Sequence, residues 1–554
     1  MHFQTKFLLL SNFFCLYFSI TGSTKSKPNI VFMLADDYGW NDVGFHGSTQ
    51  VKTPTLDNMA KEGVILNNYY LQQLCSPSRA ALLTGRYPIR TGMQYFLIEA
   101  GQRLGVPLNF KFMPEYLNEL GYESHMVGKW HLGMFNKNYT PTYRGFKTFL
   151  GYYNGYTDYF DHRTREPPEG MDPNEWWGLD WNFNEGENLT SINSDFGKYG
   201  THVMQNRAND VIKGHDFNSK PLFLYLPFQN VHSGNDVDPI QVPIEVEMQH
   251  PNIWNTLRRK YVGVVQELDN AVRNITETLS NVGVLNNTII IFSTDNGGAP
   301  NGFENNMGSN FPLRSGKGYY FEGGIRGSAF VFGPMFKNRA GNVSTDLMHV
   351  TDWLPTLYEA AGGSVSDLGD VDGHSMWSVL TGVNKTCPRT EVLVNINPIK
   401  NSKAIRVGKY KYLLNPYDVM DAEAPGELPD TFDVVEPNNT PAQIWCGKIP
   451  ANVDTKCHSE STGQDECIFD IENDPCEYYN LVDNPDYKSV KAMLLDRLDY
   501  WDYKSVQPLV PPYDPEGSPA KLGFVFKPWT DNATIPNNRN DIEIPVESYP
   551  NEVK

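Results

Sequence analysis

A chain of 554 residues is long enough to bury a large hydrophobic core, and its 40% hydrophobic and 13% aromatic residues are typical of a globular protein. The formal net charge of −19 excludes nucleic acid as the expected partner, because phosphate backbones are bound by basic surfaces. An anionic substrate would also be repelled at long range, so any site for one must be made locally positive by lysine, arginine or a metal ion.

The first residues have the pattern of a secretory signal peptide. Lys6 precedes an apolar stretch over residues 7–20, and small residues follow at 21–23. The stretch is shorter than the roughly 20 apolar residues of a membrane-spanning helix. We therefore predict a signal peptide over residues 1–23, and we do not expect an integral membrane protein.

Asn-x-Ser/Thr sequons occur eight times, and each is a potential glycosylation site in a secreted protein. Together with the signal peptide they indicate the secretory pathway, with the mature protein either lysosomal or extracellular. The candidate glycosylation sites are Asn138, Asn188, Asn274, Asn286, Asn342, Asn384, Asn438 and Asn532.

Four apolar stretches are typical of strands that are covered on both faces. Unbroken apolar residues fill positions 30–34 and 289–292, and two further stretches lie within residues 220–233 and 121–133. Runs of this kind occur in parallel sheets, where helices cover both faces.

Helical patterns lie between these strands, at residues 53–64, 258–283 and 351–362. Thr53 is a candidate N-cap for the first helix, and Gly283 is a stop signal for the second. Strands that alternate with helices predict an α/β fold, with a large, mixed, mainly parallel sheet flanked by helices.

The composition changes near residue 385, after which prolines, acidic residues and five cysteines become frequent. Residues 403–418 predict a strand hairpin, and residues 488–505 predict an amphipathic helix. We predict a larger α/β domain over residues 24–385. A smaller C-terminal domain over residues 386–554 would carry a short antiparallel sheet, a helix, disulfides and a proline-rich tail.

Polar residues follow two of the predicted strands. Asp36 and Asp37 come after the first, and Asp295 and Asn296 come after the strand at 289–292. Open α/β sheets place ligands at the carboxyl ends of their strands, and four oxygen ligands suit a hard cation such as Ca²⁺ or Mg²⁺. Turn formation is the alternative, because Asp-Asn-Gly also commonly ends a strand.

Lysines and histidines near the other strands are candidates for anion binding and proton transfer. Lys129 and His131 lie two positions apart, so in an extended segment both side chains would point to the same face. His232 follows a buried strand, and Lys317 lies between two glycines in a loop. Solvated lysines and packed histidines are the alternative interpretation of each residue taken alone.

Six cysteines remain once the signal peptide is removed, and Cys75 stands far from the other five. An even number in an oxidising compartment favours a disulfide between Cys75 and one of them. Dinucleotide-binding, Walker and serine-hydrolase motifs are absent from the sequence, and no CxxC spacing indicates a cysteine-based zinc site.

The segment Cys75-Ser76-Pro77-Ser78-Arg79, followed by Leu83-Thr84-Gly85-Arg86, resembles the signature of the sulfatase family, within the alkaline-phosphatase-like superfamily. The similarity spans residues 27–530 and is of the N-acetylgalactosamine-4-sulfatase (arylsulfatase B) type. Five further stretches match that family in order, at residues 29–47, 125–134, 291–298, 312–318 and 321–327.

The resemblance implies that the formylglycine-generating enzyme oxidises Cys75 to formylglycine during maturation. One hydroxyl of the hydrated aldehyde would then attack sulfur, and the second would expel sulfate. The implied roles are Ca²⁺ binding by Asp36, Asp37, Asp295, Asn296 and converted Cys75, positioning of the formylglycine by Arg79, sulfate binding by Lys129, His232 and Lys317, and proton transfer by His131, His232 and Lys317.

If Cys75 is converted to formylglycine, we expect the other five cysteines to form at most two disulfides and to leave one free thiol. The chain departs from the 4-sulfatase type by lacking cysteines at residues 94–106 and 134–200. An aromatic, acidic stretch at residues 167–187 also departs from it and is a candidate lining of the substrate entrance.

The expected substrate is a sulfated small molecule or a sulfated glycan, such as N-acetylgalactosamine 4-sulfate in a glycosaminoglycan. Two alternatives are a phosphomonoester or phosphonate hydrolase of the same superfamily, and a non-catalytic glycan-binding relative. All expected polar positions are filled, which favours the sulfatase.

Overall fold

The computed structural model describes residues 27–168, 170–235, 237–302, 304–416, 440–446 and 455–539. The predicted signal peptide and the sequon at Asn438 lie outside the described residues. Within the described ranges, no helix combines the length and the apolar character that crossing a membrane requires.

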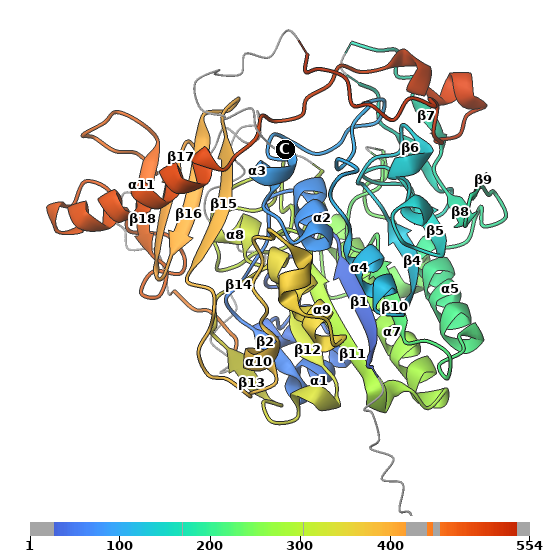
Figure 1. The fold of residues 1–554 in the computed structure, drawn as a ribbon, viewed down its shortest axis with the longest axis horizontal. Coiled ribbons are helices and arrows are strands. Elements are labelled where there is room, and N and C mark those ends of the chain that lie inside the picture. Colours follow the sequence, from blue (N-terminus) through green and yellow to red (C-terminus); the bar gives the residue numbers. More distant parts are fainter. Residues whose placement is uncertain are drawn as a thin grey trace, which may run out of the picture.

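A ten-stranded mixed sheet forms the centre of the molecule, as the sequence predicts (Figure 1). The five central strands β11, β1, β10, β4 and β5 are parallel, and strands near both edges pair antiparallel. The spatial order is β13 (Asn342–Ser344), β2 (Val64–Leu66), β12 (Phe330–Phe332), β11 (Thr288–Thr294), β1 (Asn29–Ala35), β10 (Leu222–Pro227), β4 (Glu123–Lys129), β5 (Thr148–Tyr152), β8 (Asn182–Glu185) and β9 (Asn188–Ser191).

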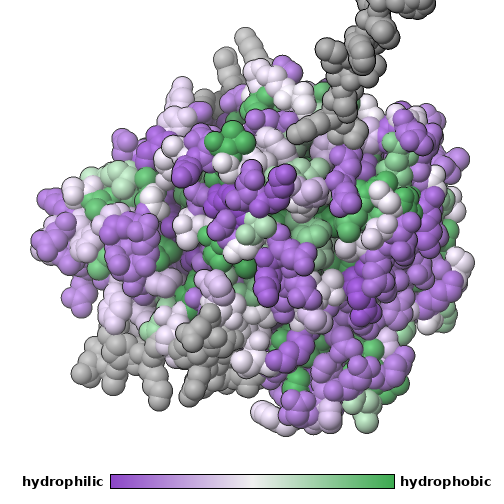
Figure 2. All heavy atoms as spheres, turned by 90° about the horizontal axis from the view of Figure 1, so that it is seen from below, coloured by the Kyte–Doolittle hydropathy of each residue, from purple (hydrophilic) through white to green (hydrophobic). Residues whose placement is uncertain are grey.

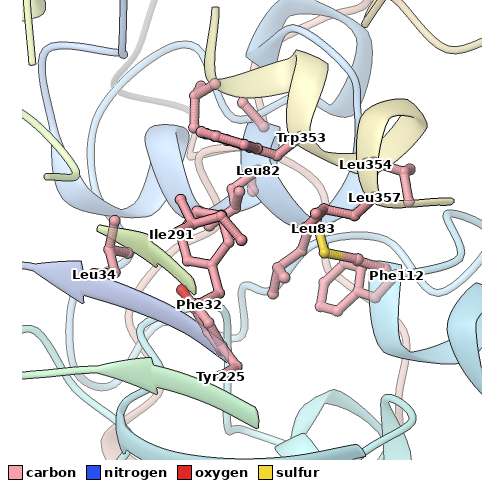
Figure 3. Close-up of a cluster of buried hydrophobic side chains, with 14 of the residues drawn as sticks. Phe32, Leu34, Leu82, Leu83, Phe112, Tyr225, Ile291, Trp353, Leu354 and Leu357 are labelled. Atoms are coloured by element: carbon pink, nitrogen blue, oxygen red, sulfur yellow. The ribbon is translucent and has the colours of Figure 1, made fainter. Parts of the chain in front are cut away.

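Alternate residues of β1 belong to two separate hydrophobic cores. Phe32 and Leu34 pack in the core that includes residues of α2 (Cys75–Thr84), α4 (Met113–Glu119) and α9 (Trp353–Ala360). Figure 3 shows Leu82, Leu83 and Trp353 lying over Phe32. Both faces of the sheet are therefore covered, which explains why its central strands are apolar throughout.

The core on the other face contains Val31 and Met33 from β1. It includes residues of α1 (Pro54–Glu62), α5 (Gly200–Gly214) and α7 (Thr256–Asn281). The three predicted helices correspond to α1, α7 and α9, and α7 ends just before Gly283. Thr53 precedes α1 but does not cap it through its side chain, because its hydroxyl donates to Asp57 and accepts from the N–H of Gly44.

A second, antiparallel sheet lies in the C-terminal region. It contains β15 (Glu391–Asn397), β16 (Ser402–Val407), β17 (Tyr410–Leu414) and β18 (Glu466–Asp470), in that order. Strands β16 and β17 form the predicted hairpin, and α11 (Lys488–Tyr503) packs on this sheet through Leu494 and Leu498. Disulfides join Cys446 to Cys476 and Cys457 to Cys467, while Cys75 and Cys387 are free thiols.

After α11 the chain (red in Figure 1) runs over the top of the molecule in that view, towards β6 and β7. Backbone N–H groups donate from Val506 to the carbonyl of Ile89 at 2.8 Å and from Trp529 to that of Phe135 at 3.1 Å. The proline-rich segment therefore packs on residues that precede 385. The domain limits 24–385 and 386–554 remain a prediction.

Figure 2 looks at the molecule from below, the side on which β1 begins, and hydrophilic residues cover much of that face with smaller hydrophobic patches between them.

Shorter elements complete the fold. The remaining strands and α-helices are β3 (Tyr69–Tyr70), α3 (Pro88–Thr91), β6 (Arg163–Arg165), β7 (Trp177–Leu179), α6 (Ile244–Glu247), α8 (Glu322–Ile325), β14 (Met348–His349) and α10 (Trp377–Leu380).

Candidate active site

Four neighbouring parallel strands end at one edge of the main sheet, and a polar residue lies at or just beyond each end. Asp36 and Asp37 follow β1, Asp295 follows β11, Lys129 is the last residue of β4, and His232 lies beyond β10. All five are almost completely buried. The structure thus brings together residues that are up to 259 positions apart in the sequence.

The carboxylates form a compact, oxygen-rich group. The N–H of Asp37 donates to Oδ1 of Asp295 at 3.2 Å, and Nδ2 of Asn296 donates to Oδ1 of Asp37 at 2.7 Å. Burial and the neighbouring Asp36 carboxylate raise the pKa of Asp295 above its usual range.

The side-chain oxygen of Asn296 provides a test of whether this group suits a cation. Its Oδ1 is buried and accepts no hydrogen bond among the described residues, although a buried carbonyl oxygen normally has a partner. With the oxygens of Asp36, Asp37 and Asp295, it makes up the donor set that a hard divalent cation prefers. The residues therefore fit a hard divalent cation such as Ca²⁺ or Mg²⁺.

Cys75 is the first residue of α2, and every residue of that helix is buried. Its Sγ lies 3.6 Å from Oδ1 of Asp36 and 3.9 Å from Oδ1 of Asp37. Pro77 is compatible with the first turn of the helix, where backbone N–H groups have no partner within the helix. The N-terminus of α2 therefore offers a favourable position for an anion beside Cys75.

The Cys75 side chain itself is a free thiol in this structure. Burial raises its pKa well above the usual range, despite the opposing charges of Lys129 and Lys317. The even number of cysteines favoured a disulfide between Cys75 and one of the others, but the structure does not contain it. Instead, Cys75 is free, and the other five cysteines form two disulfides and leave one thiol, as predicted.

Arg79 lies one turn after Cys75, on the same side of α2. Its Nη2 is 2.9 Å from Oδ2 of Asp295 and 3.4 Å from Oδ2 of Asp36, and its Nη1 donates to the carbonyl of Lys129 at 3.2 Å. The guanidinium thereby links α2 to the ends of three strands. It fixes the position of Cys75 relative to the carboxylates.

Two lysines place positive charge among the carboxylates of the site. Nζ of Lys129 lies 2.7 Å from Oδ2 of Asp36, and Nζ of Lys317 lies 2.7 Å from Oδ2 of Asp37. Burial opposes the charge of Lys317, but the surrounding Asp37, Cys75 and Glu304 groups raise its pKa well above the usual range. Both ammonium groups are therefore held charged inside the protein.

His232 lies beside Lys317. Its Nε2 is 3.2 Å from Nζ of Lys317 and 3.4 Å from Oδ2 of Asp37, and the ring of Tyr156 stacks parallel to it. Burial and Lys317 disfavour its protonation, but the carboxylates of Asp37 and Glu304 outweigh them and raise the pKa of His232.

His131 does not follow the geometry that the sequence suggested. Strand β4 ends at Lys129, and His131 has a positive φ of 57°, so the two residues do not share the face of one extended strand. Nε2 of His131 lies 2.9 Å from the carbonyl oxygen of Ile98, while its buried Nδ1 has no hydrogen-bond partner among the described residues. Burial and the charges of Lys129 and Arg79 lower its pKa well below the usual range.

Glu304 belongs to this group, and the sequence analysis missed it. Its Oε2 lies 3.1 Å from Nε2 of His232 and also contacts Nζ of Lys317. Although burial raises its pKa, the charges of Lys317 and His232 outweigh burial and lower it well below the usual range. A single glutamate in a loop has no distinguishing pattern, and only its proximity to the Asp295-Asn296-Gly297-Gly298 segment was a signal.

The fold and the site define an α/β protein with a carboxylate group that could hold a cation, beside two lysines and an arginine that could pair with an anion. The sequence profile of the sulfatase family matches residues 28–364, which is more than half of the chain. The chain belongs to the sulfatase family, and it is a sulfuric ester hydrolase.

Relatives with assigned names agree with this family. Arylsulfatase J of Mus musculus is 38% identical over 528 residues, which are 91% of this chain and 80% of that protein. N-acetylgalactosamine-6-sulfatase of Canis lupus familiaris is 34% identical over 364 residues, which are 64% of this chain and 66% of that protein. Arylsulfatase A of Bos taurus is 28% identical, covering 85% of this chain and 86% of that protein.

Solved structures have the same fold. The crystal structure of Ps i-CgsB in complex with k-i-k-neocarrahexaose has a TM-score of 0.67 and 28% identity, covering 87% of this chain and 94% of that chain. The PsFucS1 sulfatase from Pseudoalteromonas sp. has a TM-score of 0.64 at 22% identity, covering 86% of this chain and 90% of that chain.

Proposed function

We propose that this enzyme hydrolyses sulfate monoesters of glycans with a formylglycine nucleophile made from Cys75 and with one bound Ca²⁺ ion. The observation that carries the proposal is the position of Cys75. It lies at a helix N-terminus within 4 Å of two carboxylates, and the side chains that contact those carboxylates include Lys129 and Lys317.

The surroundings of Cys75 suit an anionic substrate. The ammonium groups of Lys129 and Lys317 and the N–H groups at the start of α2 would bind the sulfate oxygens and stabilise the charge that develops on them. Arg79 would keep Cys75 aligned through its contacts with Asp36 and Asp295. The hydrate of formylglycine would supply the hydroxyl that attacks sulfur.

The ligands of Ca²⁺ would be Asp36, Asp37, Asp295, Asn296 and the converted Cys75. When bound, the ion would offset the charge of the carboxylates and lower the pKa of a neighbouring hydroxyl group. The unsatisfied Oδ1 of Asn296 supports this assignment.

Proton transfer would be divided between the two histidines. His232, with its raised pKa, suits the donation of a proton to the leaving alcohol, and Lys317 lies beside it as a second donor. The lowered pKa of His131 keeps its ring neutral, and its Nδ1, which has no partner among the described residues, would accept a proton from the second hydroxyl of the hydrate.

A substrate entrance beside this pocket is large enough for sugar residues. A cavity of about 300 Å³ is lined by Tyr156, Asn235 and Glu304. A second cavity of about 500 Å³ shares Tyr156 and Asn235 with it and continues to Arg165 and Trp177. The predicted entrance stretch at residues 167–187 thus contributes to this depression, which supports a glycan substrate.

The proposed sulfated sugar is N-acetylgalactosamine 4-sulfate within a glycosaminoglycan. The name of one relative, N-acetylgalactosamine-6-sulfatase, and the hexaose bound to Ps i-CgsB are consistent with a sulfated sugar. A panel of 4-sulfated and 6-sulfated N-acetylgalactosamine, carrageenan oligosaccharides and an aryl sulfate tests the choice, and the 4-sulfate should have the highest kcat/KM.

We further propose maturation in the secretory pathway, with the formylglycine-generating enzyme as a transient partner and a lysosomal or extracellular destination. Five sequon asparagines are exposed, at 188, 286, 342, 384 and 532, whereas Asn138 and Asn274 are half-buried. Asn274, on α7, also donates to Gln205 on α5, so glycosylation there would break that contact.

Mass spectrometry of the peptide that contains Cys75 tests the nucleophile. The active protein should carry an aldehyde at position 75, and Cys75→Ala should lose nearly all activity toward an aryl sulfate. An unmodified thiol in fully active protein would contradict the mechanism.

Two further experiments test the metal and the substrate class. Asp295→Ala or removal of Ca²⁺ should abolish activity while the secondary structure is retained, and activity that persists in both would exclude the metal assignment. Faster hydrolysis of an aryl phosphate than of the matching aryl sulfate would favour the phosphomonoesterase alternative.

A further inference from the structure

A second group of potential metal ligands lies at the start of strand β4, the end of that strand away from the active site. It consists of Glu123 and His125, at the start of β4, and His215, which follows the last residue of α5. Residues 123 and 129 are six positions apart on β4, so the group is roughly 20 Å from Lys129 in the active site. No step of the proposed hydrolysis uses it.

The orientation of His215 is the central observation. Its side chain is 2% exposed, and its Nε2 lies 2.8 Å from the carbonyl oxygen of Lys220. A carbonyl only accepts, so Nε2 carries a proton and Nδ1 is the ring nitrogen left to bind an ion. That Nδ1 is buried without a hydrogen-bond partner among the described residues, and it lies 3.6 Å from Oε1 of Glu123. A cation between this Nδ1 and Oε1 of Glu123 would be bound by both.

His125 completes the group from the neighbouring position on the same face of β4. Its Nε2 is 3.2 Å from Oε1 of Glu123, and its Nδ1 is 2.7 Å from the hydroxyl of Thr148. Metal-binding histidines are usually held in this way, with one nitrogen toward the ion and the other toward an oxygen of the protein. His125 and His215 both have such an oxygen partner.

The distances agree with a tetrahedral site. Zn²⁺ binds nitrogen and carboxylate oxygen at about 2.0–2.2 Å, which places two ligand atoms ~3.4 Å apart. The measured separations from Oε1 of Glu123 are 3.2 Å to His125 and 3.6 Å to His215, and all three ligand atoms lie within 4.8 Å of one another. Lys147 pairs with the other oxygen, Oε2 of Glu123, at 2.9 Å, so Oε1 remains available.

We propose that Glu123, His125 and His215 form a zinc-binding site that joins the C-terminal end of α5 to the start of β4. Two imidazoles and one carboxylate favour a borderline ion such as Zn²⁺ over Ca²⁺, which prefers oxygen ligands. The site therefore differs in ion preference from the all-oxygen group at the active site. A bound ion stabilises the folded state, because the unfolded chain does not hold the three ligands together.

Zinc binding by the full-length, metal-stripped enzyme tests the proposal. With excess Ca²⁺ present to fill the active-site group, calorimetry with Zn²⁺ should show one site, and Co²⁺ should give the visible absorption of a tetrahedral nitrogen and oxygen site. Zn²⁺ should also raise the Tm. His215→Ala and Glu123→Gln should each weaken Zn²⁺ binding by more than about tenfold and remove the rise in Tm.

The matched control is His458→Ala, which removes a partly exposed histidine that pairs with Asp465 in the C-terminal region. This variant should bind Zn²⁺ as the wild type does. Absence of Zn²⁺ binding by the wild type, or equal binding by the wild type and both ligand variants, would overturn the proposal. Activity toward an aryl sulfate should be the same in all proteins tested in Ca²⁺ alone, which distinguishes this site from failure of the active site.

Discussion

Glu304 places a carboxylate in a pocket that otherwise suits an anion. It contacts both Lys317 and His232, and it lines the cavity that leads to them. A sulfate that binds Lys317 would have to displace this contact or lie beside a like charge. At the scale of single residues, the site therefore contains a group that opposes substrate binding and raises the pKa of its proposed acid.

Replacement Glu304→Gln should lower the KM for an aryl sulfate several-fold, because it removes the repulsion and frees Lys317. Loss of the same charge should lower the pKa of His232, so the alkaline limb of kcat/KM should move to lower pH. Steady-state kinetics across pH measures both effects, with the exposed Glu187→Gln as a control. A higher KM at every pH would contradict this role.

Glu166 is a second half-buried acid, and its set of hydrogen bonds is incomplete. Its Oε1 accepts only a long bond of 3.4 Å from the N–H of Ala100, and its Oε2 is buried without a partner among the described residues. Burial, with smaller effects from Glu304 and Glu99, raises its pKa to about 8. The folded protein therefore favours the protonated form.

This group should stabilise the fold below its unfolded pKa of about 4.5 and cease to do so as the pH rises through about 8. Glu166→Gln removes the titration, so the loss of Tm between these pH values should be smaller than in the wild type. Thermal unfolding at both pH values measures it, with Glu187→Gln as the control. Equal losses in the two proteins would show that Glu166 is ionised in the folded state.

At the scale of elements, α2 connects the core to the site. Its first residue is Cys75, while Leu82 and Leu83 at its other end pack beneath α9 and over the sheet (Figure 3). The helix ends at Gly85, whose positive φ of 65° closes the C-terminus through an N–H to the carbonyl of Ala81. Packing at one end of α2 thus holds the position of Cys75, the proposed nucleophile, at the other.

Leu83→Ala should destabilise the protein by about 2–5 kcal/mol, because it leaves a cavity at a fully buried position. We expect a lower Tm and a lower kcat with little change in formylglycine content. Leu108→Ala, at a site that is 42% exposed, is the control and should change neither. An unchanged Tm for Leu83→Ala would mean that the core closes around the missing side chain.

For the whole molecule, a buried ionic group joins the C-terminal sheet to helix α8. Nζ of Lys411, on β17, lies 3.0 Å from Oε1 of Glu322 at the start of α8 and 2.8 Å from Oε1 of Glu477. None of the three side chains is exposed to solvent. Lys411 and Arg326, which pairs with the other oxygen of Glu322 at 3.2 Å, therefore compensate the two carboxylates where the C-terminal sheet meets α8.

Lys411→Met should destabilise the protein by about 3–5 kcal/mol, because Glu477 loses its ion-pair partner inside the protein and Glu322 keeps only Arg326. The Tm should fall more at pH 8 than at pH 5, since protonation of the carboxylates relieves the penalty. Lys409→Met, which breaks a surface pair with Asp470, is the control and should leave the Tm unchanged. Equal Tm values for the two variants would exclude a structural role of the buried group.

The sequence predicted the features that depend on a few neighbouring residues. The apolar stretches at 30–34 and 289–292 indicated buried strands because strand burial follows the side-chain pattern of each strand. The residues after them were expected to meet because parallel strands end at one edge. The segment around Cys75 indicated the family through residues within one helical turn.

Only the tertiary structure decided which distant residues meet. The contact of Glu304 with Lys317, the turn that takes His131 off the strand, and the pairing of Cys446 with Cys476 follow no sequence period. The same is true of His215 and Glu123, which lie on different elements. The physical reason is that periodicity and capping are local properties, whereas these contacts depend on how the whole chain packs around its two cores.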